Sequence, residues 1–327
     1  MPLAAETPGV RTTGPPVLVT GAPRSGTTIL GRLLAAPRHV AMVYEPFNLH
    51  IGLRDIPRQF VYVSTGTTDE PVVEAAVEAL LAGRGTFRPS GIPGHTPGPV
   101  KRLLRRALVS RTSVDYRLAA HDPRRTRWLL KDPLAGFSAE WLARRFGMSV
   151  VVIVRHPAAT VASYLRLGWR FSLTELQQQP ELMRDHLEPV LSDVDAGRLT
   201  AVEEGALLWR SYYEVLGRYL DRNPGMTVVR HEDLSREPLV VLGALYRHLG
   251  LRLDDRIARR VRAYTGAHNR AGPAPGAVQT LRRNSMESID VWRLALSPED
   301  AARIRQLAGP VGARWYADPD DWSTSVP

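Results

Sequence analysis

The sequence predicts an α/β protein of three layers, in which a parallel sheet of about five strands lies between two layers of helices. Three observations support this class. Short apolar runs rich in β-branched residues recur along the 327 residues, turn residues follow each run, and a helical pattern comes next. Nearly continuous apolar strands are typical of parallel sheets that are buried on both faces. Strands of this kind that alternate with helices give a layered α/β fold.

The strands are expected, in chain order, at 17–20, 40–44, 128–131, 150–154 and 226–230. The first strand is followed by a glycine-containing loop and by a helical run over 29–36. The fourth ends in Arg155-His156-Pro157, and proline suits the first position of the helix that follows. No repeat and no convincing linker is visible, so we expect one domain over 16–320 after a disordered N-terminal tail over 1–15.

The composition is that of an ordinary globular protein, with 44% hydrophobic and 23% charged residues. The chain has no cysteine, which excludes a thiol nucleophile, a disulfide framework and a cysteine-ligated metal. No group of His, Asp and Glu has the spacing of metal ligands, so we expect no metal. The N-terminus lacks the pattern of a signal peptide, and no stretch approaches the ~18 apolar residues of a membrane span. We therefore expect a cytoplasmic protein without stable membrane insertion.

The net charge of +10 does not indicate a nucleic-acid partner. The basic residues are almost all arginine, with lysine only at Lys101 and Lys131, as in proteins from high-GC bacterial genomes. The arginines are scattered and form no basic stripe interleaved with aromatic residues. A protein that holds a multiply charged anion needs no further partner to explain a positive sign.

A phosphate-binding loop is predicted directly after the first strand, where the sequence reads Gly21-Ala22-Pro23-Arg24-Ser25-Gly26-Thr27-Thr28. Backbone N–H groups converge in such a loop, and the dipole of the following helix favours negative charge. The two glycines have the spacing of the P-loop pattern G-x-x-x-x-G-K-[ST], but Thr27 stands in place of the lysine. Because that lysine contacts the β- and γ-phosphates, its absence argues against ATP or GTP chemistry.

The remaining side chains of the loop suit a shorter anhydride, made of one phosphate and one sulfate. Arg24 supplies a cation, and Ser25, Thr27 and Thr28 supply hydroxyls. The structural alternative is a plain glycine turn with a threonine as the N-cap of the helix.

The segment Pro23-Arg24-Ser25-Gly26-Thr27-Thr28 resembles the 5′-phosphosulfate loop of sulfotransferases, especially of the tyrosylprotein, carbohydrate and bacterial branches. The resemblance implies a P-loop-like fold and the binding of 3′-phosphoadenosine 5′-phosphosulfate (PAPS). Arg155 lies at the end of the fourth strand and Ser163 about two turns into the next helix, so a guanidinium and a hydroxyl can bracket one phosphate. This pair resembles the 3′-phosphate motif of the same family, which would assign both residues to PAPS.

Three further segments extend the resemblance from about residue 17 to 292. Lys131-Asp132-Pro133 resembles a K-D-P segment of the bacterial and carbohydrate branches, and 229–234 resembles a shared R-x-E-D-L stretch of architectural character. The segment 281–293 resembles the C-terminal loop that closes over the nucleotide, in which Arg282, Arg283 and Ser285 could reach the 3′-phosphate. An exposed arginine pair of this kind can equally be a solvated surface feature.

Glu45 is the candidate general base. It ends the second strand, beside the loop of the first strand if the two strands are neighbours, and Pro46 turns the chain at the carboxyl-end crevice where ligands bind in such sheets. The tyrosylprotein and carbohydrate branches have a glutamate here, whereas aryl and steroid sulfotransferases use a histidine after a K-T segment, which this chain lacks. The alternative is a salt bridge between Glu45 and Arg24 or another arginine.

Lys131 and Arg24 are the other candidate catalytic residues, because a cation must hold the charge that develops on the sulfuryl and bridging oxygens. Lys131 could instead pair with Asp132 or Asp233. His156 is a possible alternative base, although packing is the better interpretation of its place.

The predicted activity is transfer of a sulfuryl group from PAPS to a hydroxyl of a small-molecule, natural-product or glycosidic acceptor, with release of 3′,5′-ADP. The stretches 49–125 and 167–200 lack strand signals and are expected to be insertions that set acceptor specificity. Two alternatives remain open. One is a P-loop small-molecule kinase, which would need the missing lysine and magnesium, and the other is a non-catalytic nucleotide or glycan binder.

Overall fold

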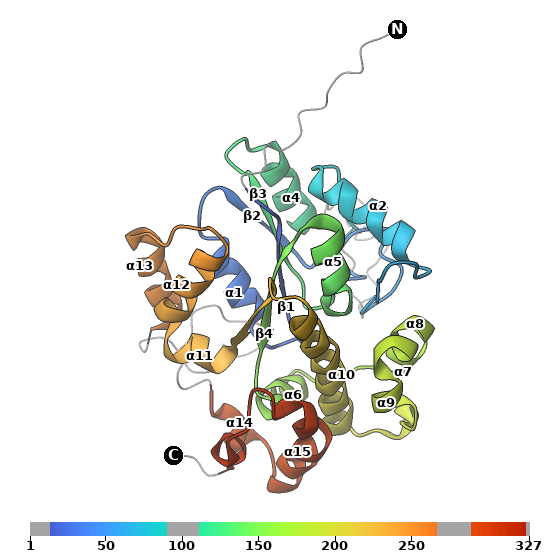
Figure 1. The fold of residues 1–327 in the computed structure, drawn as a ribbon. Helices are drawn as coiled ribbons and strands as arrows, with labels where there is room; N and C mark the ends of the chain where they lie inside the picture. The colour runs from blue at the N-terminus through green and yellow to red at the C-terminus, as the bar shows by residue number, and fades with distance from the viewer. Residues whose placement is uncertain (1–13, 90–110, 267–288, 325–327) are drawn as a thin grey trace, which may run out of the picture.

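The computed structural model describes residues 14–89, 111–266 and 289–324. Its centre is a five-stranded sheet in the order β2-β3-β1-β4-β5, and every pair of neighbours is parallel (Figure 1). The strands are β1 Val17–Thr20, β2 Val40–Tyr44, β3 Arg127–Lys131, β4 Ser149–Val154 and β5 Thr227–Arg230. The predicted fold class is confirmed, and each predicted strand begins and ends within one residue of the observed one.

Helices cover both faces of this sheet. They are α1 Thr27–Leu34, α2 Glu70–Leu81, α4 Arg111–His121, α5 Ala139–Phe146, α6 Pro157–Arg166, α7 Thr174–Gln177, α8 Pro180–Leu182, α9 Glu188–Leu191, α10 Ala201–Arg222, α11 His231–Arg236, α12 Pro238–His248, α13 Asp255–Thr265, α14 Val291–Ala295 and α15 Pro298–Gly312. Short 3₁₀ turns lie at Gly136–Ser138, Ala196–Arg198 and Pro319–Trp322, and one π-helical turn at Met183–Leu187. None of the helices in the described ranges is long and apolar enough to cross a membrane.

Alternate residues of each strand enter two separate cores. Val17 and Val19 of β1 pack with helices α1, α12 and α13 on one face, and Leu18 packs with α5, α6 and α10 on the other (Figure 1). This division follows from the pleat of a strand, which sends successive side chains to opposite faces. Burial on both faces explains why the strands read as unbroken apolar runs.

The order of the strands decides which loops meet at the carboxyl edge of the sheet. β3 lies between β1 and β2, so the strand that ends before Glu45 is not a neighbour of the strand that precedes the phosphate loop. Tyr44 of β2 pairs instead with Lys131 of β3. The glutamate and the phosphate loop therefore meet across the end of β3.

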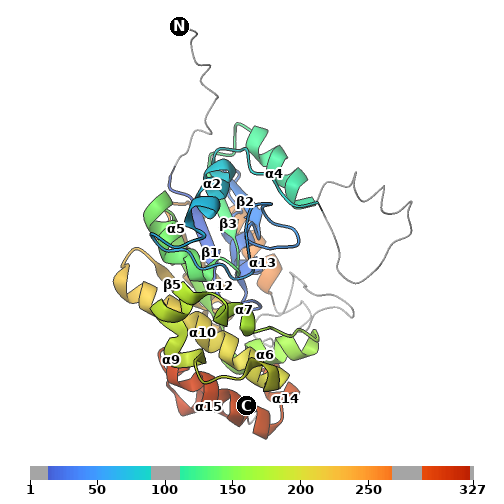
Figure 2. The same cartoon turned by 90° about the vertical axis from the view of Figure 1, so that its right-hand side faces the viewer.

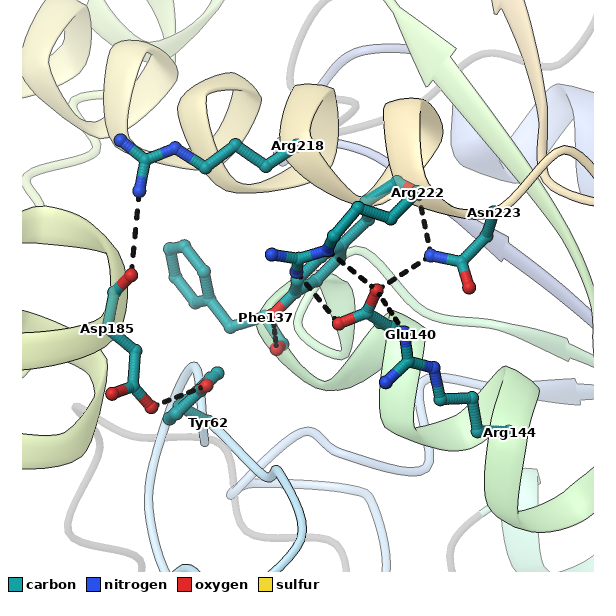
Figure 3. Close-up of polar contacts among 9 residues, drawn as sticks. Tyr62, Phe137, Glu140, Arg144, Asp185, Arg218, Arg222 and Asn223 are labelled. Atoms are coloured by element: carbon teal, nitrogen blue, oxygen red, sulfur yellow. Dashed lines mark hydrogen bonds and ion pairs between the residues drawn. The ribbon is translucent and has the colours of Figure 1, made fainter.

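The longest helix, α10, organises the second core. A capping box begins it, in which the Thr200 hydroxyl accepts from the N–H of Glu203 and the Glu203 carboxylate accepts from the N–H of Thr200. α6 and α15 pack against each other and against α10, and α14 packs on α6 (Figure 2). At its other end, Arg222 and Asn223 donate to the carboxylate of Glu140 on α5, which also accepts from Arg144 (Figure 3).

The described parts of the two stretches without strand signals lie against each other. The buried amide of Gln179 accepts from the N–H of Tyr62 at 2.9 Å and donates to the carbonyl of Phe60 at 3.2 Å. The Tyr62 hydroxyl donates to Asp185 at 2.9 Å (Figure 3). The Thr68 hydroxyl donates to Glu181 at 2.8 Å. The described residues of 49–125 and 167–200 are thus joined by hydrogen bonds into one packed unit.

Candidate active site

A cavity of about 460 Å³ opens at the carboxyl edge of the sheet, a volume that suits a small ligand. Residues at or just after the ends of all five strands contribute to it, together with the end of α13. Most of the predicted site residues that fall in the described ranges line this one cavity, namely Pro23, Arg24, Gly26, Thr27, Thr28, Glu45, Lys131 and Arg155. This is the place where open α/β sheets bind ligands.

The phosphate loop is held in a backbone conformation that favours glycine. Gly21 has a φ of 147° and Gly26 a φ of 110°, and Arg24 adopts a φ of 69° although it carries a side chain. A Cβ on Gly26 would lie 2.8 Å from Cδ2 of His231, so the loop is also tightly packed. Such strain persists only where the surroundings impose it, and it clusters at ligand sites.

Helix α1 begins at Thr27 without a side-chain cap, because Gly26 is its N-cap. The N–H groups of a first helical turn have no partner within the helix. With the helix dipole they form a site for an anion at the floor of the cavity. The alternative of a glycine turn capped by a threonine side chain is therefore not what the structure shows.

Two buried tyrosines hold the loop from below. Tyr164 donates to the carbonyl of Pro23 at 2.7 Å. Tyr213 accepts from the N–H of Ala22 at 3.2 Å and donates to the carbonyl of Ile153 at 2.8 Å. Burial raises the pKa of both phenols well above the usual range, so both remain neutral donors.

Arg24 is anchored by the residues predicted for the second phosphate. Its Nε donates to the Ser163 hydroxyl at 3.2 Å, and its carbonyl accepts from Nη1 of Arg155 at 3.2 Å. Its guanidinium also lies over the Trp169 ring, 5.6 Å from the centroid. Arg155 and Ser163 therefore both contact Arg24, and Arg155 also lines the cavity. Burial lowers the pKa of Arg155, although an arginine stays charged.

Glu45 and Lys131 form an ion pair at the other side of the cavity. Nζ of Lys131 lies 2.5 Å from Oε1 of Glu45 and 3.8 Å from the centre of the Tyr44 ring. Glu45 has a φ of 48°, one of three non-glycine residues with a positive φ in the described ranges. Its side chain is 14% exposed, and that of Lys131 is 1% exposed. A carboxylate held this way faces the cavity while its cation is shielded from water.

The ion pair that Glu45 and Lys131 make is not one of those considered as alternatives from the sequence. Glu45 pairs with Lys131 and not with Arg24, and Lys131 pairs with neither Asp132 nor Asp233. Asp132 points to the opposite face of the strand, where it accepts from the N–H of Phe47 at 2.6 Å and from that of Leu134 at 2.8 Å. Burial, with the charge of Glu45, raises the pKa of Asp132 to about 7.

Two other predicted residues, Ser25 and His156, have clear places in the structure. Ser25 is fully buried beneath the loop and is not part of the cavity wall. His156 stacks on Trp292 and packs against Tyr316 and Trp322, and burial lowers its pKa to about 3, so it is a neutral packing residue. Arg282, Arg283 and Ser285 lie outside the described residues.

The cavity wall also contains residues that the sequence did not single out. Asn48 and His50 follow Glu45, His231 packs on the phosphate loop, and Trp169 and Phe171 lie at the start of the second insertion. His231 begins α11 directly after β5, and the others lie on loops without a periodic pattern, so only their proximity to Glu45 or to strand ends could have indicated them. Among the described residues, no group of three or more His, Asp or Glu could hold a metal ion.

These observations define a class: an α/β protein whose lysine-free phosphate loop faces a glutamate and a lysine across one cavity. A sequence model described as "Sulfotransferase family" matches residues 15–255 of the chain. The chain therefore belongs to the sulfotransferase family, and it is a sulfotransferase as the sequence predicts. No curated protein matches it.

Several solved structures are similar to the chain. The sulfotransferase domain of the curacin biosynthetic pathway is 14% identical, with 90% of this chain and 97% of that one covered and a TM-score of 0.44. The corresponding domain of the Synechococcus PCC 7002 olefin synthase is 16% identical, with 92% and 95% covered and a TM-score of 0.41. A sulfotransferase from Mycobacterium avium is 16% identical, with 93% and 76% covered and a TM-score of 0.43.

Proposed function

We propose that the protein transfers a sulfuryl group from PAPS to a hydroxyl of a small-molecule, natural-product or glycosidic acceptor, with Glu45 as general base. One observation carries the proposal: the carboxylate of Glu45 and the phosphate loop line the same cavity, with Lys131 bound to the carboxylate. A base must lie within hydrogen-bond reach of the proton that it takes, and the cavity offers that position beside an anion site.

The residues of the loop fit the 5′-phosphosulfate. The first turn of α1 and the guanidinium of Arg24 supply N–H donors, and Thr27 and Thr28 supply hydroxyls at the cavity wall. Arg155 would hold the 3′-phosphate by charge. Ser163 accepts from Arg24, which leaves its own O–H to donate to a phosphate oxygen. Arg282, Arg283 and Ser285 remain proposed contacts of the same phosphate.

Glu45 takes the proton of the acceptor hydroxyl as the oxygen attacks sulfur. The bond between sulfur and the bridging oxygen breaks, and 3′,5′-ADP leaves with the electron pair. Lys131 and Arg24 stabilise the charge on the sulfuryl and bridging oxygens, where preorganised donors lower the barrier most. No step requires a metal, and we propose that none takes part.

The acceptor would bind against Trp169 and Phe171, which line the same cavity as Glu45. These aromatic side chains belong to the stretch 167–200, and Gln59 of the stretch 49–125 lies in the same wall. Aromatic surfaces with a few amides bind flat apolar or glycosidic groups and orient their hydroxyls. We propose both stretches as the acceptor-specificity insertions of a domain over 16–320, acting in the bacterial cytoplasm.

The proposal is tested by incubating the protein with PAPS and a panel of phenols, alcohols and methyl glycosides, and measuring 3′,5′-ADP and sulfated product. Glu45→Gln should bind 3′,5′-ADP as the wild type does and lose turnover by about 10²-fold or more, the usual effect of removing a general base. Glu299→Gln, a change of an exposed glutamate on α15, serves as the control. Unchanged turnover in Glu45→Gln would reject the base, and a wild type that forms no product would favour the non-catalytic binder.

A further inference from the structure

The loop after β2 is built to hold Asn48 against Glu45. The N–H of Asn48 donates to the carbonyl of Glu45 at 3.1 Å, and the carbonyl of Asn48 accepts from the N–H of Gly52 at 2.7 Å. The N–H of Leu53 closes the loop on the carbonyl of Pro46 at 2.7 Å. A Cβ on Gly52 would lie 2.6 Å from the carbonyl oxygen of Asn48, so the loop leaves no room for a side chain there.

The side chain of Asn48 has a fixed orientation. Its Oδ1 accepts from the backbone N–H of His50 at 2.8 Å, which only an oxygen can do. Its Nδ2 therefore faces Glu45 and donates to Oε2 at 2.8 Å. The amide cannot be reversed without losing both contacts.

The two oxygens of Glu45 consequently have different partners. Oε1 contacts the ammonium of Lys131 at 2.5 Å, and Oε2 contacts the neutral amide of Asn48. Each carboxylate oxygen has two lone pairs, so each can still receive a proton. A full positive charge opposes protonation of the oxygen it contacts more strongly than a neutral amide does. Oε2 is thus the better proton acceptor of the two.

We propose that Asn48 is a positioning residue for catalysis, which holds Glu45 so that Oε2 takes the proton of the acceptor. This inference rests on the proposed function, in which Glu45 is the base. The acceptor O–H bond breaks as the bond from Oε2 to hydrogen forms. The new oxygen–sulfur bond replaces the bond between sulfur and the 5′-phosphate, which leaves as 3′,5′-ADP. Lys131 stays in contact with Oε1 throughout, and it lines the same cavity as the phosphate loop.

The experiment measures release of 3′,5′-ADP from PAPS as a function of pH, with water as acceptor, so that no identified acceptor is needed. 2-Naphthol and methyl β-D-glucopyranoside are added as organic probes. Asn48→Ala should lower kcat by roughly 10-fold to 100-fold, because a misplaced base loses rate, and should leave the Kd for 3′,5′-ADP within a factor of two to three. Asn48→Ser, which keeps a small polar side chain, is the second variant should the alanine fold poorly.

Asn48→Asp places a carboxylate against Oε2 with little change of shape. A like charge favours the protonated form of its neighbour, so the acidic limb of the pH–rate profile should move about one pH unit or more upward. Asn223→Asp is the matched control. Nδ2 of Asn223 donates to Oε1 of Glu140 at 2.7 Å, which is the same kind of contact between an amide and a carboxylate, and neither residue lines the cavity. This control should lower stability in a comparable way and leave the profile where it is.

The outcomes distinguish a failure of the role of Asn48 from a failure of the proposed role of Glu45 as general base. Wild-type kcat in Asn48→Ala and Asn48→Ser, or an unmoved profile in Asn48→Asp, would overturn the role of Asn48. If Asn48→Asp and Asn223→Asp move the profile alike, the effect is structural and the inference is also wrong. Turnover that survives in Glu45→Gln instead overturns the proposed base, whatever the Asn48 variants do. A wild type that binds 3′,5′-ADP but releases none from PAPS overturns both.

Discussion

Nζ of Lys131 lies 2.5 Å from Oε1 of Glu45, although the two residues are 86 positions apart in the chain. The contact follows from the sheet, in which Lys131 ends β3 and pairs with Tyr44, the last residue of β2. β3 also borders β1, whose loop binds the anion in our account. One buried cation therefore stands between the candidate base and the phosphate loop.

Lys131→Met should remove this cation while the apolar stem keeps its place. We expect kcat to fall by about 10²-fold to 10³-fold, the usual effect of losing one electrostatic contact to a transition state. Steady-state kinetics checks this effect, and a kcat within threefold of wild type would exclude Lys131 from catalysis.

Gly31→Ala should displace Lys131 from the side of α1. A Cβ on Gly31 would lie 2.9 Å from Cγ and 3.1 Å from Cβ of Lys131, so the lysine must shift. We expect kcat to fall by roughly tenfold or more, because small misplacements of catalytic groups are costly.

Gly243→Ala in α12 is the matched helical control, because a Cβ there meets nothing closer than 3.7 Å. It should raise stability by about 0.5–1 kcal/mol, as alanine does in helices. Kinetics and urea unfolding of both variants distinguish the cases. If Gly31→Ala retained wild-type turnover, the packing of Lys131 on α1 would not matter to the reaction.

Asp132→Asn should change how stability depends on pH. Burial raises the pKa of Asp132 to about 7 in the folded protein, above its unfolded value of 3.8. The folded state then holds the proton more tightly, so the stabilising contribution is complete below pH 3.8 and is lost as the pH rises towards 7. The slope can reach about 1.4 kcal/mol per pH unit for one group.

Urea unfolding of the wild type and of Asp132→Asn between pH 4.5 and 7.5 measures this contribution. The free energy of unfolding of the wild type should fall relative to that of the variant across this range. Parallel curves would show that the two N–H donors from Phe47 and Leu134 keep Asp132 ionised in spite of its burial.

Trp169→Ala should weaken binding of the acceptor. Trp169 lies in the cavity wall and is 36% exposed, a surface that a planar acceptor group can cover. We expect the KM for the acceptor to rise by about tenfold, within the range of aromatic anchors, whereas Trp169→Phe keeps most of the affinity. If the affinity for 3′,5′-ADP falls while the KM for the acceptor is unchanged, Trp169 positions Arg24 and does not bind the acceptor.

Much of the fold could be predicted from the sequence, because buried β-branched runs mark each strand and the glycine loop marks the first turn. The order of the strands could not, since all five strands are apolar runs of the same kind and nothing local distinguishes neighbours. The position of β3 between β1 and β2 could therefore not be predicted from the sequence of any of these strands.

The candidate site was predicted in part. Residues at strand ends, such as Glu45, Lys131 and Arg155, could be found because parallel strands bring their carboxyl ends to one edge. The partner of Lys131 could not be found, since it depends on strand order. Asn48 and Trp169 were missed because loop residues reach a cavity through tertiary contacts alone, which leave no periodic pattern in the sequence.

The central claim is recognition of a 3′-phosphorylated nucleotide, and isothermal titration with 3′,5′-ADP, ADP and ATP tests it most directly. We predict micromolar or tighter binding of 3′,5′-ADP, with a preference over ADP of at least ~1.4 kcal/mol, or tenfold. Equal or tighter binding of ATP would contradict the assignment of Arg155 and Ser163 and favour a kinase instead.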